Sequence, residues 1–372
     1  MTELMIIADD FTGALDAGVH FAERGIGTRV IVSLDHDRSW EEGIRSGETT
    51  VLVIDAETRH VSPDQAYRKV FAVAKDAREA GIPYIYKKTD SALRGNIGSE
   101  LEAAYRAAGE PFLSFVPALP QMNRITRGGR QYIDGVPVSK SVFGRDPFEP
   151  VTKDSVKDII CLQSEIPVIE THGEARPGPG QAGIVVYDAT TEADIRRIGA
   201  DLTVTGQNRL MAGCAGFAAI LPDLLGLKRQ EPETAALERR LFVICGSVNP
   251  ITRRQLDWGE RVGYPRIYMA AEEKLNPEFW RSEQGAGLTR RLTQESSEND
   301  CVILDTNDRE GERNTLEYAR ELGMDTGQVR SRIPETLGII LKNMLDCGLH
   351  AVILVTGGDT PVSYTHLRAH ET

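Results

Sequence analysis

Charged and hydroxyl side chains follow several short apolar runs of the sequence, at points where strands of a parallel sheet would end. The first run (4–8) leads into Asp9 and Asp10, and the third run (50–54) is followed by Arg59. The fourth run leads into the densest set, which consists of Lys87, Lys88, Thr89, Asp90, Ser91 and Arg94. Cations can bind a carboxylate, while carboxylates and hydroxyls can bind the hydroxyls of a polyol. Because ligands bind beyond the carboxyl ends of parallel strands, this pattern predicts a site for a small anionic polyol.

Each of these features also has a plainer interpretation. Asp9 and Asp10 could be a helix N-cap and its solvated neighbour, and Arg59 could be an ordinary surface arginine. The densest set could belong to a solvated loop. A second group of cations, which could bind an anion or form a solvated face, consists of Arg124, Arg127 and Arg130.

Two glycine-rich turns in the second half of the chain follow apolar runs at 241–245 and 350–355. Backbone N–H groups in such turns can cradle phosphate oxygens, although glycine also simply ends many strands. Because two such turns occur in one half of the chain, we predict a nucleotide site there. The residues assigned to it are Ser247, Gly357, Gly358, Asp359 and Thr360.

The pattern of secondary structure predicts an α/β protein, because short apolar runs alternate with longer amphipathic stretches. Helices are expected at 64–80, about 252–262 and about 330–346, and a hairpin is expected within 124–140. Strands are expected at 4–8, 28–33, 50–54, 83–86, 112–116, 183–187, 241–245, 300–305 and 350–355.

The chain is long enough for two domains, each a mainly parallel sheet flanked by helices. Residues 226–240 are charged and poor in large apolar side chains, and the strand–helix pattern restarts after them. We therefore predict an N-terminal domain at 1–228 that carries the anionic polyol site, a linker at 229–240 and a C-terminal nucleotide-binding domain at 241–372. The active site is expected in the cleft between the two domains.

Composition excludes several other classes of protein. The 372 residues carry a net charge of −12, which disfavours nucleic acid and anionic membranes as partners. No apolar run reaches the roughly 18 residues of a membrane span, and the N-terminus lacks a basic signal-peptide region. The five cysteines are scattered, which indicates a reducing cytoplasm, and no metal-ligand spacing occurs, so no protein-bound metal site is predicted.

Several blocks of the sequence together resemble the four-carbon acid sugar kinase family, which includes D-threonate and D-erythronate kinases. The string IADDFTGALD at 7–16 resembles the opening of the family, and KKTDSALRGNIG at 87–98 matches its second motif. Further matching blocks lie, in the family's order, at 117–120, 127–135, 246–248 and 356–360. A P-loop is absent, and the one GxGxxG string, at 178–183, precedes a strand instead of following one.

The resemblance implies a domain that binds the sugar acid, followed by a domain that binds ATP. It carries the family's substrate contacts to Asp9 or Asp10, to Arg59 and to residues 87–90, and its ATP contacts to Ser247 and residues 357–360. Family members continue beyond this last turn with an apolar helix, another nucleotide-binding loop and a closing strand. The segment 361–372 is instead short and polar. A C-terminal domain truncated after about residue 360, and a weak kinase, are therefore expected.

The implied reaction transfers the γ-phosphoryl group of ATP to a hydroxyl of a four-carbon sugar acid, with Mg²⁺ on the phosphates. Arg59 and Lys88 would hold the carboxylate of the acid, while Lys87 or Arg94 could face the phosphates. A non-catalytic sugar-acid-binding protein and a nicotinamide-dependent dehydrogenase are the alternatives, and a homodimer is left open. The proton acceptor is also left open, among Asp10, Asp90 and Asp359.

Overall fold

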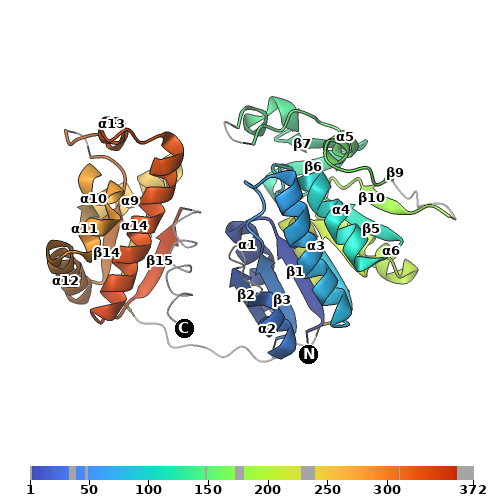
Figure 1. The fold of residues 1–372 in the computed structure, drawn as a ribbon, viewed down its shortest axis with the longest axis horizontal. Helices are drawn as coiled ribbons and strands as arrows, with labels where there is room; N and C mark the ends of the chain where they lie inside the picture. Colours follow the sequence, from blue (N-terminus) through green and yellow to red (C-terminus); the bar gives the residue numbers. More distant parts are fainter. Residues whose placement is uncertain are drawn as a thin grey trace. The chain divides into compact units, whose positions relative to one another are not determined.

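The chain forms two compact units, Met1–Glu233 and Thr234–Thr372, in the computed structural model (Figure 1). The structure describes residues 2–32, 39–46, 49–146, 149–171, 180–227, 239–309 and 311–357. The predicted linker at 229–240 lies outside the described residues except for Arg239 and Arg240. The tail at 361–372 also lies outside them.

The first unit is built on an eight-stranded sheet in which all neighbouring strands run parallel, in the order β2-β3-β1-β4-β11-β5-β10-β9. All six strands predicted for this unit are confirmed, but β9 and β11 were not predicted. The strands are β1 (Leu4–Ala8), β2 (Thr28–Val32), β3 (Val51–Asp55), β4 (Tyr84–Lys88), β5 (Phe112–Val116), β9 (Val168–Thr171), β10 (Gly183–Tyr187) and β11 (Leu210–Gly213).

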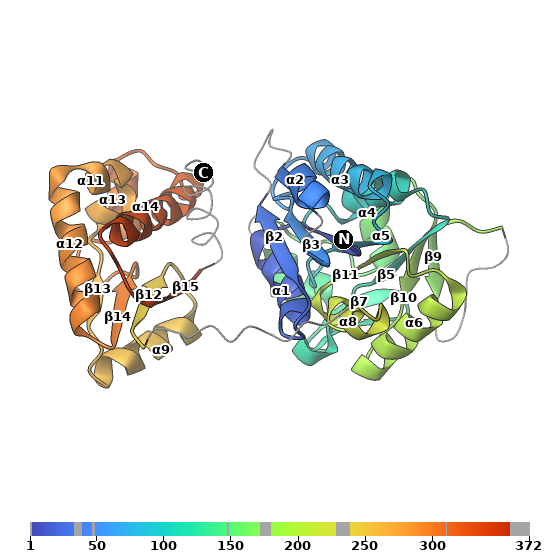
Figure 2. The same cartoon turned by 90° about the horizontal axis from the view of Figure 1, so that it is seen from below.

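Helices cover both faces of this sheet, which is why β1, β3 and β10 are buried at every position. One face packs against α3 and α4, which lie side by side, and the other packs against α1 and α6 (Figures 1 and 2). The helices are α1 (Phe11–Ala22), α2 (Ser39–Ser46), α3 (Pro63–Glu79), α4 (Ile97–Ala108), α5 (Val156–Cys161), α6 (Glu192–Thr205), α7 (Ala215–Ala218) and α8 (Leu221–Leu224).

A small antiparallel sheet departs from the main sheet after β5 and confirms the predicted hairpin. It consists of β6 (Arg124–Arg127), β7 (Arg130–Ile133) and β8 (Val136–Pro137), with short 3₁₀ turns η1 (Pro120–Met122), η2 (Val138–Lys140) and η3 (Val142–Arg145) around it. Thr126 of β6 bridges to Ala189, which follows β10. The small sheet therefore lies beyond the carboxyl ends of the main strands (Figure 1).

The second unit has a four-stranded parallel sheet in the order β13-β14-β12-β15. Helix α9 packs on one face, and α12 and α14 pack on the other (Figure 2). Its three predicted strands and two predicted helices are confirmed, while β13 was not predicted. The elements are β12 (Leu241–Cys245), α9 (Pro250–Arg261), β13 (Arg266–Tyr268), α10 (Ala271–Leu275), α11 (Pro277–Arg281), α12 (Glu283–Glu298), β14 (Cys301–Asp305), α13 (Thr315–Glu321), α14 (Thr326–Asp346) and β15 (Val352–Thr356).

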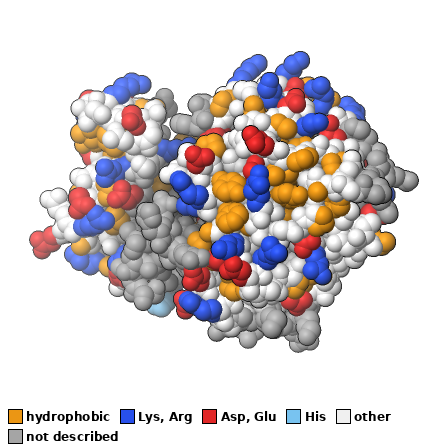
Figure 3. Space-filling model, turned by 45° about the vertical axis from the view of Figure 1, so that its right-hand side comes forward, with side chains coloured by type: hydrophobic (Ala, Val, Ile, Leu, Met, Phe, Trp, Pro, Cys, Tyr) orange, Lys and Arg blue, Asp and Glu red, His pale blue; other side chains and the backbone are white. Residues whose placement is uncertain are grey.

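On the face drawn in Figure 3, positive and negative side chains are interspersed, with hydrophobic side chains between them. Within the described part of the chain, no helix combines the length and the apolar character that a membrane span requires.

Candidate active site

Four predicted site residues meet at the carboxyl edge of the first sheet, because β3, β1 and β4 are neighbours. The Nε and Nη2 atoms of Arg59 each lie 2.8 Å from Oδ2 of Asp9, and Nη1 lies 2.5 Å from Oδ2 of Asp10. Nη2 also lies 3.7 Å from Oδ1 of Asp90. The loops after three separate strands therefore converge on one guanidinium group.

The loop that carries Arg59 is held in place by backbone and amide hydrogen bonds. The backbone N–H groups of Thr58 and Arg59 donate to the carbonyl oxygen of Asp9 over 2.9 and 3.1 Å. The Nδ2 group of Asn96, which precedes α4, donates to the carbonyl oxygens of Thr58 and Val61 over 2.8 and 2.9 Å. The loop is thus tied both to β1 and to the start of α4, so Arg59 has a defined position.

Asp10 also caps the first helix, as one of the sequence interpretations proposed. Its Oδ1 accepts a hydrogen bond of 2.8 Å from the N–H of Gly13. A Cβ atom on Gly13 would lie 2.6 Å from that Oδ1 and 2.9 Å from Nζ of Lys88. A side chain at this position would therefore displace one or both of these charged groups, because they approach the helix backbone closely. The Nζ of Lys88 itself donates to the carbonyl oxygen of Thr89 over 3.0 Å.

Lys87 lies in the core of the unit and not at the edge of the sheet. Its side chain is fully buried, and its Nζ lies 2.9 Å from Oε2 of Glu100, a buried residue of α4. It also donates to the carbonyl oxygen of Lys88 over 2.7 Å. This placement corrects the prediction that Lys87 faces a ligand, because β4 alternates its side chains and turns this one toward α4.

Asp90 is held by Arg94 through a two-pronged interaction. Nε of Arg94 donates to Oδ2 of Asp90, and Nη2 donates to Oδ1, each over 3.0 Å. Nη1 of Arg94 also contacts Oδ2 of Asp146 over 3.3 Å. Thr89, which lies between Lys88 and Asp90 in the sequence, is fully buried. Its hydroxyl has no hydrogen-bond partner among the described residues.

Ser91 contacts the small antiparallel sheet, which brings residues to the site that the sequence did not assign to it. Its hydroxyl accepts a hydrogen bond from Nη1 of Arg124, and its carbonyl oxygen accepts one of 3.1 Å from Nε2 of Gln131. The guanidinium groups of Arg94 and Arg124 both stack on the ring of Phe143, at 5.1 and 5.0 Å from its centroid. The basic cluster around 124–130 was the signal in the sequence that could have identified Arg124.

The charges of the site shift the pKa values of its carboxylates in opposite directions. Burial and the charge of Asp9 raise the pKa of Asp10, although Arg59 and Lys88 lower it. Burial also opposes ionisation of Asp9 and Asp90, but the nearby cations outweigh it. Arg59 with the two lysines lowers the pKa of Asp9, and Arg94 with Arg59 lowers that of Asp90 well below its usual range. Among these three, Asp10 has the carboxylate best able to accept a proton.

The predicted nucleotide turns of the second unit lie against each other, because β12 and β15 are paired. Gly357 has a φ of 111°, and a Cβ atom there would lie 2.9 Å from the carbonyl carbon of Gly246 and 3.1 Å from the nitrogen of Ser247. Asn307, after β14, donates to the carbonyl oxygen of Ser247 over 3.1 Å. The remaining predicted residues, Gly358, Asp359 and Thr360, lie outside the described residues.

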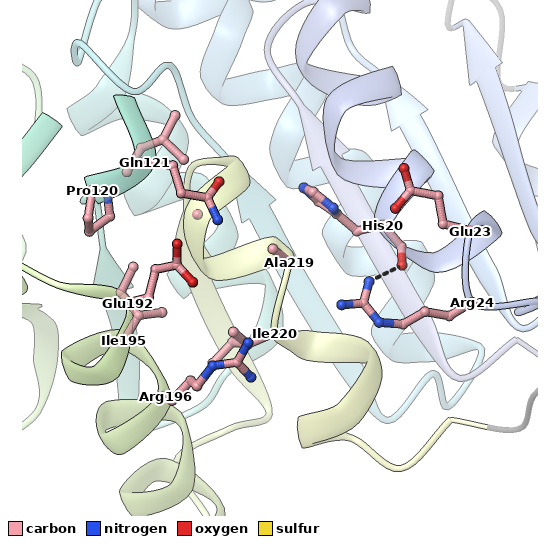
Figure 4. A pocket seen from close by; sticks show the side chains of 12 residues that line it. His20, Glu23, Arg24, Pro120, Gln121, Glu192, Ile195, Arg196, Ala219 and Ile220 are labelled. Atoms are coloured by element: carbon pink, nitrogen blue, oxygen red, sulfur yellow. Dashed lines mark hydrogen bonds between the residues drawn. The ribbon is translucent and has the colours of Figure 1, made fainter. Parts of the chain in front are cut away.

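A separate pocket of about 160 Å³ lies between α1 and α6 (Figure 4). Glu23 and Arg24 line it from the turn after α1, and Glu192 and Arg196 line it from α6, so these four charges balance. None of the predicted site residues lines this pocket.

Comparison with known proteins supports this division of the chain into two binding units. A family described as a sugar-binding N-terminal domain matches residues 4–221, and one described as a nucleotide-binding C-terminal domain matches residues 242–369. The D-threonate kinase of Salmonella typhimurium is 30% identical over 370 residues, which cover 96% of this chain and 84% of that kinase. The D-erythronate kinase of Heliobacterium modesticaldum is 28% identical over 382 residues, which cover 98% and 85%.

Solved structures show the same fold. A Haemophilus influenzae protein superposes with a TM-score of 0.74 at 18% identity, covering 98% of this chain and 88% of that one. A Bordetella bronchiseptica protein, described as a domain-swapped dimer with bound citrate, superposes with a TM-score of 0.53 at 24% identity, covering 98% and 85%. The chain belongs to the four-carbon acid sugar kinase family, a class of phosphotransferases.

Proposed function

We propose that this chain transfers the γ-phosphoryl group of ATP to a hydroxyl of a four-carbon sugar acid of the D-threonate or D-erythronate type. The observation that carries the proposal is the convergence of Asp9, Asp10, Arg59 and Asp90 at one edge of the sugar-binding unit. These groups present both signs of charge within a few ångströms, as an acidic polyol requires. The printed names of the relatives supply the substrate class.

The substrate-binding set that we propose lies on the loops after β1, β3 and β4. Asp10 and Asp90 can accept hydrogen bonds from hydroxyls, while Lys88 and Arg94 supply positive charge. Lys87 is not part of this set, because its ammonium group is buried against Glu100. The complete set is Asp9, Asp10, Arg59, Lys88, Thr89, Asp90, Ser91 and Arg94.

Asp10 is our choice for the group that accepts the proton of the attacked hydroxyl. Its pKa is raised, whereas Asp90 is held ionised by two hydrogen bonds from Arg94 and is a weaker base. Asp359, the third candidate of the sequence, lies outside the described residues. The side chain of Asp10 keeps 22% of its surface exposed, so a hydroxyl can reach it.

ATP would bind at the glycine turns of the second unit, with Ser247 and residues 357–360 around its phosphates. The close approach of Gly357 to Gly246 leaves backbone without side chains at the sheet edge, which suits phosphate oxygens. Mg²⁺ would neutralise charge on the phosphates, and it is commonly bound through them with only one or two carboxylates. Transfer requires the two sites to face each other across a cleft, which forms part of this proposal.

Two further parts of the proposal concern the protein in the cell. A homodimer is supported by the dimeric Bordetella bronchiseptica relative. The cytoplasm is the compartment that supplies ATP, and the scattered cysteines are reduced there.

The test is ATP consumption by the purified chain in the presence of D-threonate, D-erythronate and their stereoisomers, with the phosphorylated product identified by mass spectrometry. Turnover that depends on one of these acids supports the proposal. Binding of the acid without ATP consumption would favour the non-catalytic sugar-acid-binding protein. Binding of NAD(P) with no effect of ATP would favour the dehydrogenase.

A further inference from the structure

Arg124 differs from the other arginines of the site because no carboxylate of the described residues lies at ion-pair distance from it. Arg59 lies at ion-pair distance from three carboxylates, and Arg94 lies at that distance from Asp90 and Asp146. Among the described residues, the contacts of the Arg124 guanidinium are the neutral hydroxyl of Ser91 and the ring of Phe143. A guanidinium has five N–H donors, so most of the donors of Arg124 are free for a ligand.

The neutral contacts of Arg124 hold it at the site. The backbone of β6 begins at Arg124, whose N–H and C=O both pair with Leu119, over 3.1 and 2.7 Å. The Phe143 ring fixes the plane of the guanidinium, and Ser91 fixes one of its edges. A planar cation held in this way is preorganised for a planar anion.

The contacts of Arg124 place it beside other site residues. Ser91, whose hydroxyl accepts a hydrogen bond from Arg124, directly follows Asp90, and the ring that Arg124 stacks on also carries the guanidinium group of Arg94. Lys88 resembles Arg124 in one respect, since within the described part of the chain its ammonium group has a carbonyl partner but no carboxylate at ion-pair distance.

We infer that Arg124, together with Lys88, binds the carboxylate of the sugar acid and sets the preference of the enzyme for acids over neutral polyols. This inference rests on the proposed function and revises one part of it. Arg59 was expected to hold the carboxylate, but its donors already contact three carboxylates of the protein itself. Arg59 is instead a positioning residue that holds Asp9, Asp10 and Asp90 in place.

The strand that carries Arg124 offers a matched control. Arg127 lies three residues along β6 and also stacks on an aromatic ring, that of Tyr132, at 5.1 Å. Side chains alternate along a strand, so Arg127 points away from the face that Arg124 shares with Thr126. Arg127 is exposed, whereas Arg124 is partly buried.

The experiment compares wild type, Arg124→Ala, Arg124→Lys and Arg127→Ala with D-threonate and with D-threonamide, its neutral amide. We expect Arg124→Ala to raise the KM for D-threonate about 10- to 100-fold, the value of a charge-assisted hydrogen bond. The KM for ATP should stay unchanged, and the preference of wild type for the acid over the amide should disappear. Arg124→Lys should restore part of the affinity, and Arg127→Ala should behave as wild type. Melting temperatures show that each variant is folded.

Three results would overturn the inference: an unchanged KM for D-threonate in Arg124→Ala, an equal effect of Arg127→Ala, or a rise in the KM for ATP alone. The last would assign Arg124 to the phosphates. Calorimetric titration of D-threonate without ATP separates this inference from the proposed function. A wild type that binds the acid more tightly than Arg124→Ala but consumes no ATP contradicts the kinase and supports the role of Arg124.

Discussion

The carboxyl edges of the two parallel sheets are built from different chemical groups. In the first unit, β3, β1 and β4 end in charged side chains that contact one another over distances from 2.5 to 3.7 Å. In the second unit, β12 and β15 end in small residues, and the backbone of Gly357 lies against that of Gly246. The ends of β3, β1 and β4 therefore present side chains, whereas the ends of β12 and β15 present backbone.

This difference fits what each edge would recognise under the proposed function. A sugar acid carries a carboxylate and several hydroxyls in fixed directions, so donors and acceptors must be placed individually by side chains. The oxygens of a phosphate chain are alike and close together, so a row of backbone N–H groups can bind them if no Cβ atom intervenes. Substitutions of charged side chains should thus have their largest effects on catalysis and stability in the first unit. Added Cβ atoms should instead weaken ATP binding in the second unit.

The largest expected effect is on the charged edge. Asp10→Asn removes the proposed proton acceptor while it keeps an oxygen that can cap α1, so kcat should fall about 10²–10⁴-fold. A coupled assay of ADP release measures this fall. The control Asp16→Asn changes an exposed residue of the same helix and should leave kcat unchanged. A normal kcat in Asp10→Asn would exclude Asp10 as the base.

The next effect is on the stability of the same edge. Arg59→Ala leaves three carboxylates without their shared cation, and the free energy of unfolding should fall by about 3–5 kcal/mol. Urea denaturation measures the change. Arg45→Ala, which removes an exposed contact of 3.9 Å with Glu41, should cost less than about 1 kcal/mol. Equal losses in the two variants would show that Arg59 does not organise the edge.

On the backbone edge, Gly357→Ala should raise the KM for ATP about tenfold, which corresponds to about 1.4 kcal/mol. The added Cβ would lie 2.9 Å from the carbonyl carbon of Gly246, and the alanine would have to adopt a φ of 111°. Gly348→Ala is the matched control, because Gly348 has a φ of 86° but no atom near its Cβ position. If both variants bind ATP equally, close approach of the backbone is not what the nucleotide site requires.

The smallest effect concerns two buried aspartates at strand ends. Asp305, the last residue of β14, is paired with Arg266 at 2.6 Å, whereas Asp55, the last residue of β3, lies beside Glu57. Burial and the charge of Glu57 raise the pKa of Asp55 to about 9. The folded chain thus keeps a proton that the unfolded chain loses near pH 4, so this group lowers stability as the pH rises toward about 9.

Wild type should therefore lose about 1 kcal/mol of unfolding free energy through Asp55 between about pH 6 and about pH 7. Asp55→Asn cannot ionise, and its unfolding free energy should fall less over the same interval. Urea denaturation of both proteins at the two pH values measures the difference. Parallel pH dependences would show that Asp55 is ionised in the folded chain.

Some strands could not be predicted from the sequence, and the reason is physical. Strand β11 has the short sequence LMAG, followed by further small residues, and its apolar run is too short to separate from a turn. Yet it lies between β4 and β5, where it brings Gly213 beside Lys88. The longer apolar runs were identified because burial on both faces of a parallel sheet requires continuous hydrophobic sequence.

The sequence by itself determined the parallel α/β architecture and the strand ends at which polar residues gather, since both depend on the order of residues along the chain. Only the tertiary structure decided how the charges pair. Lys87 is neutralised by Glu100 and Arg59 by three carboxylates. Arg124 is brought to Ser91, and no described residue of opposite charge pairs with it. Pairing depends on distances between side chains far apart in the sequence, and those distances exist only once the strands and loops have packed.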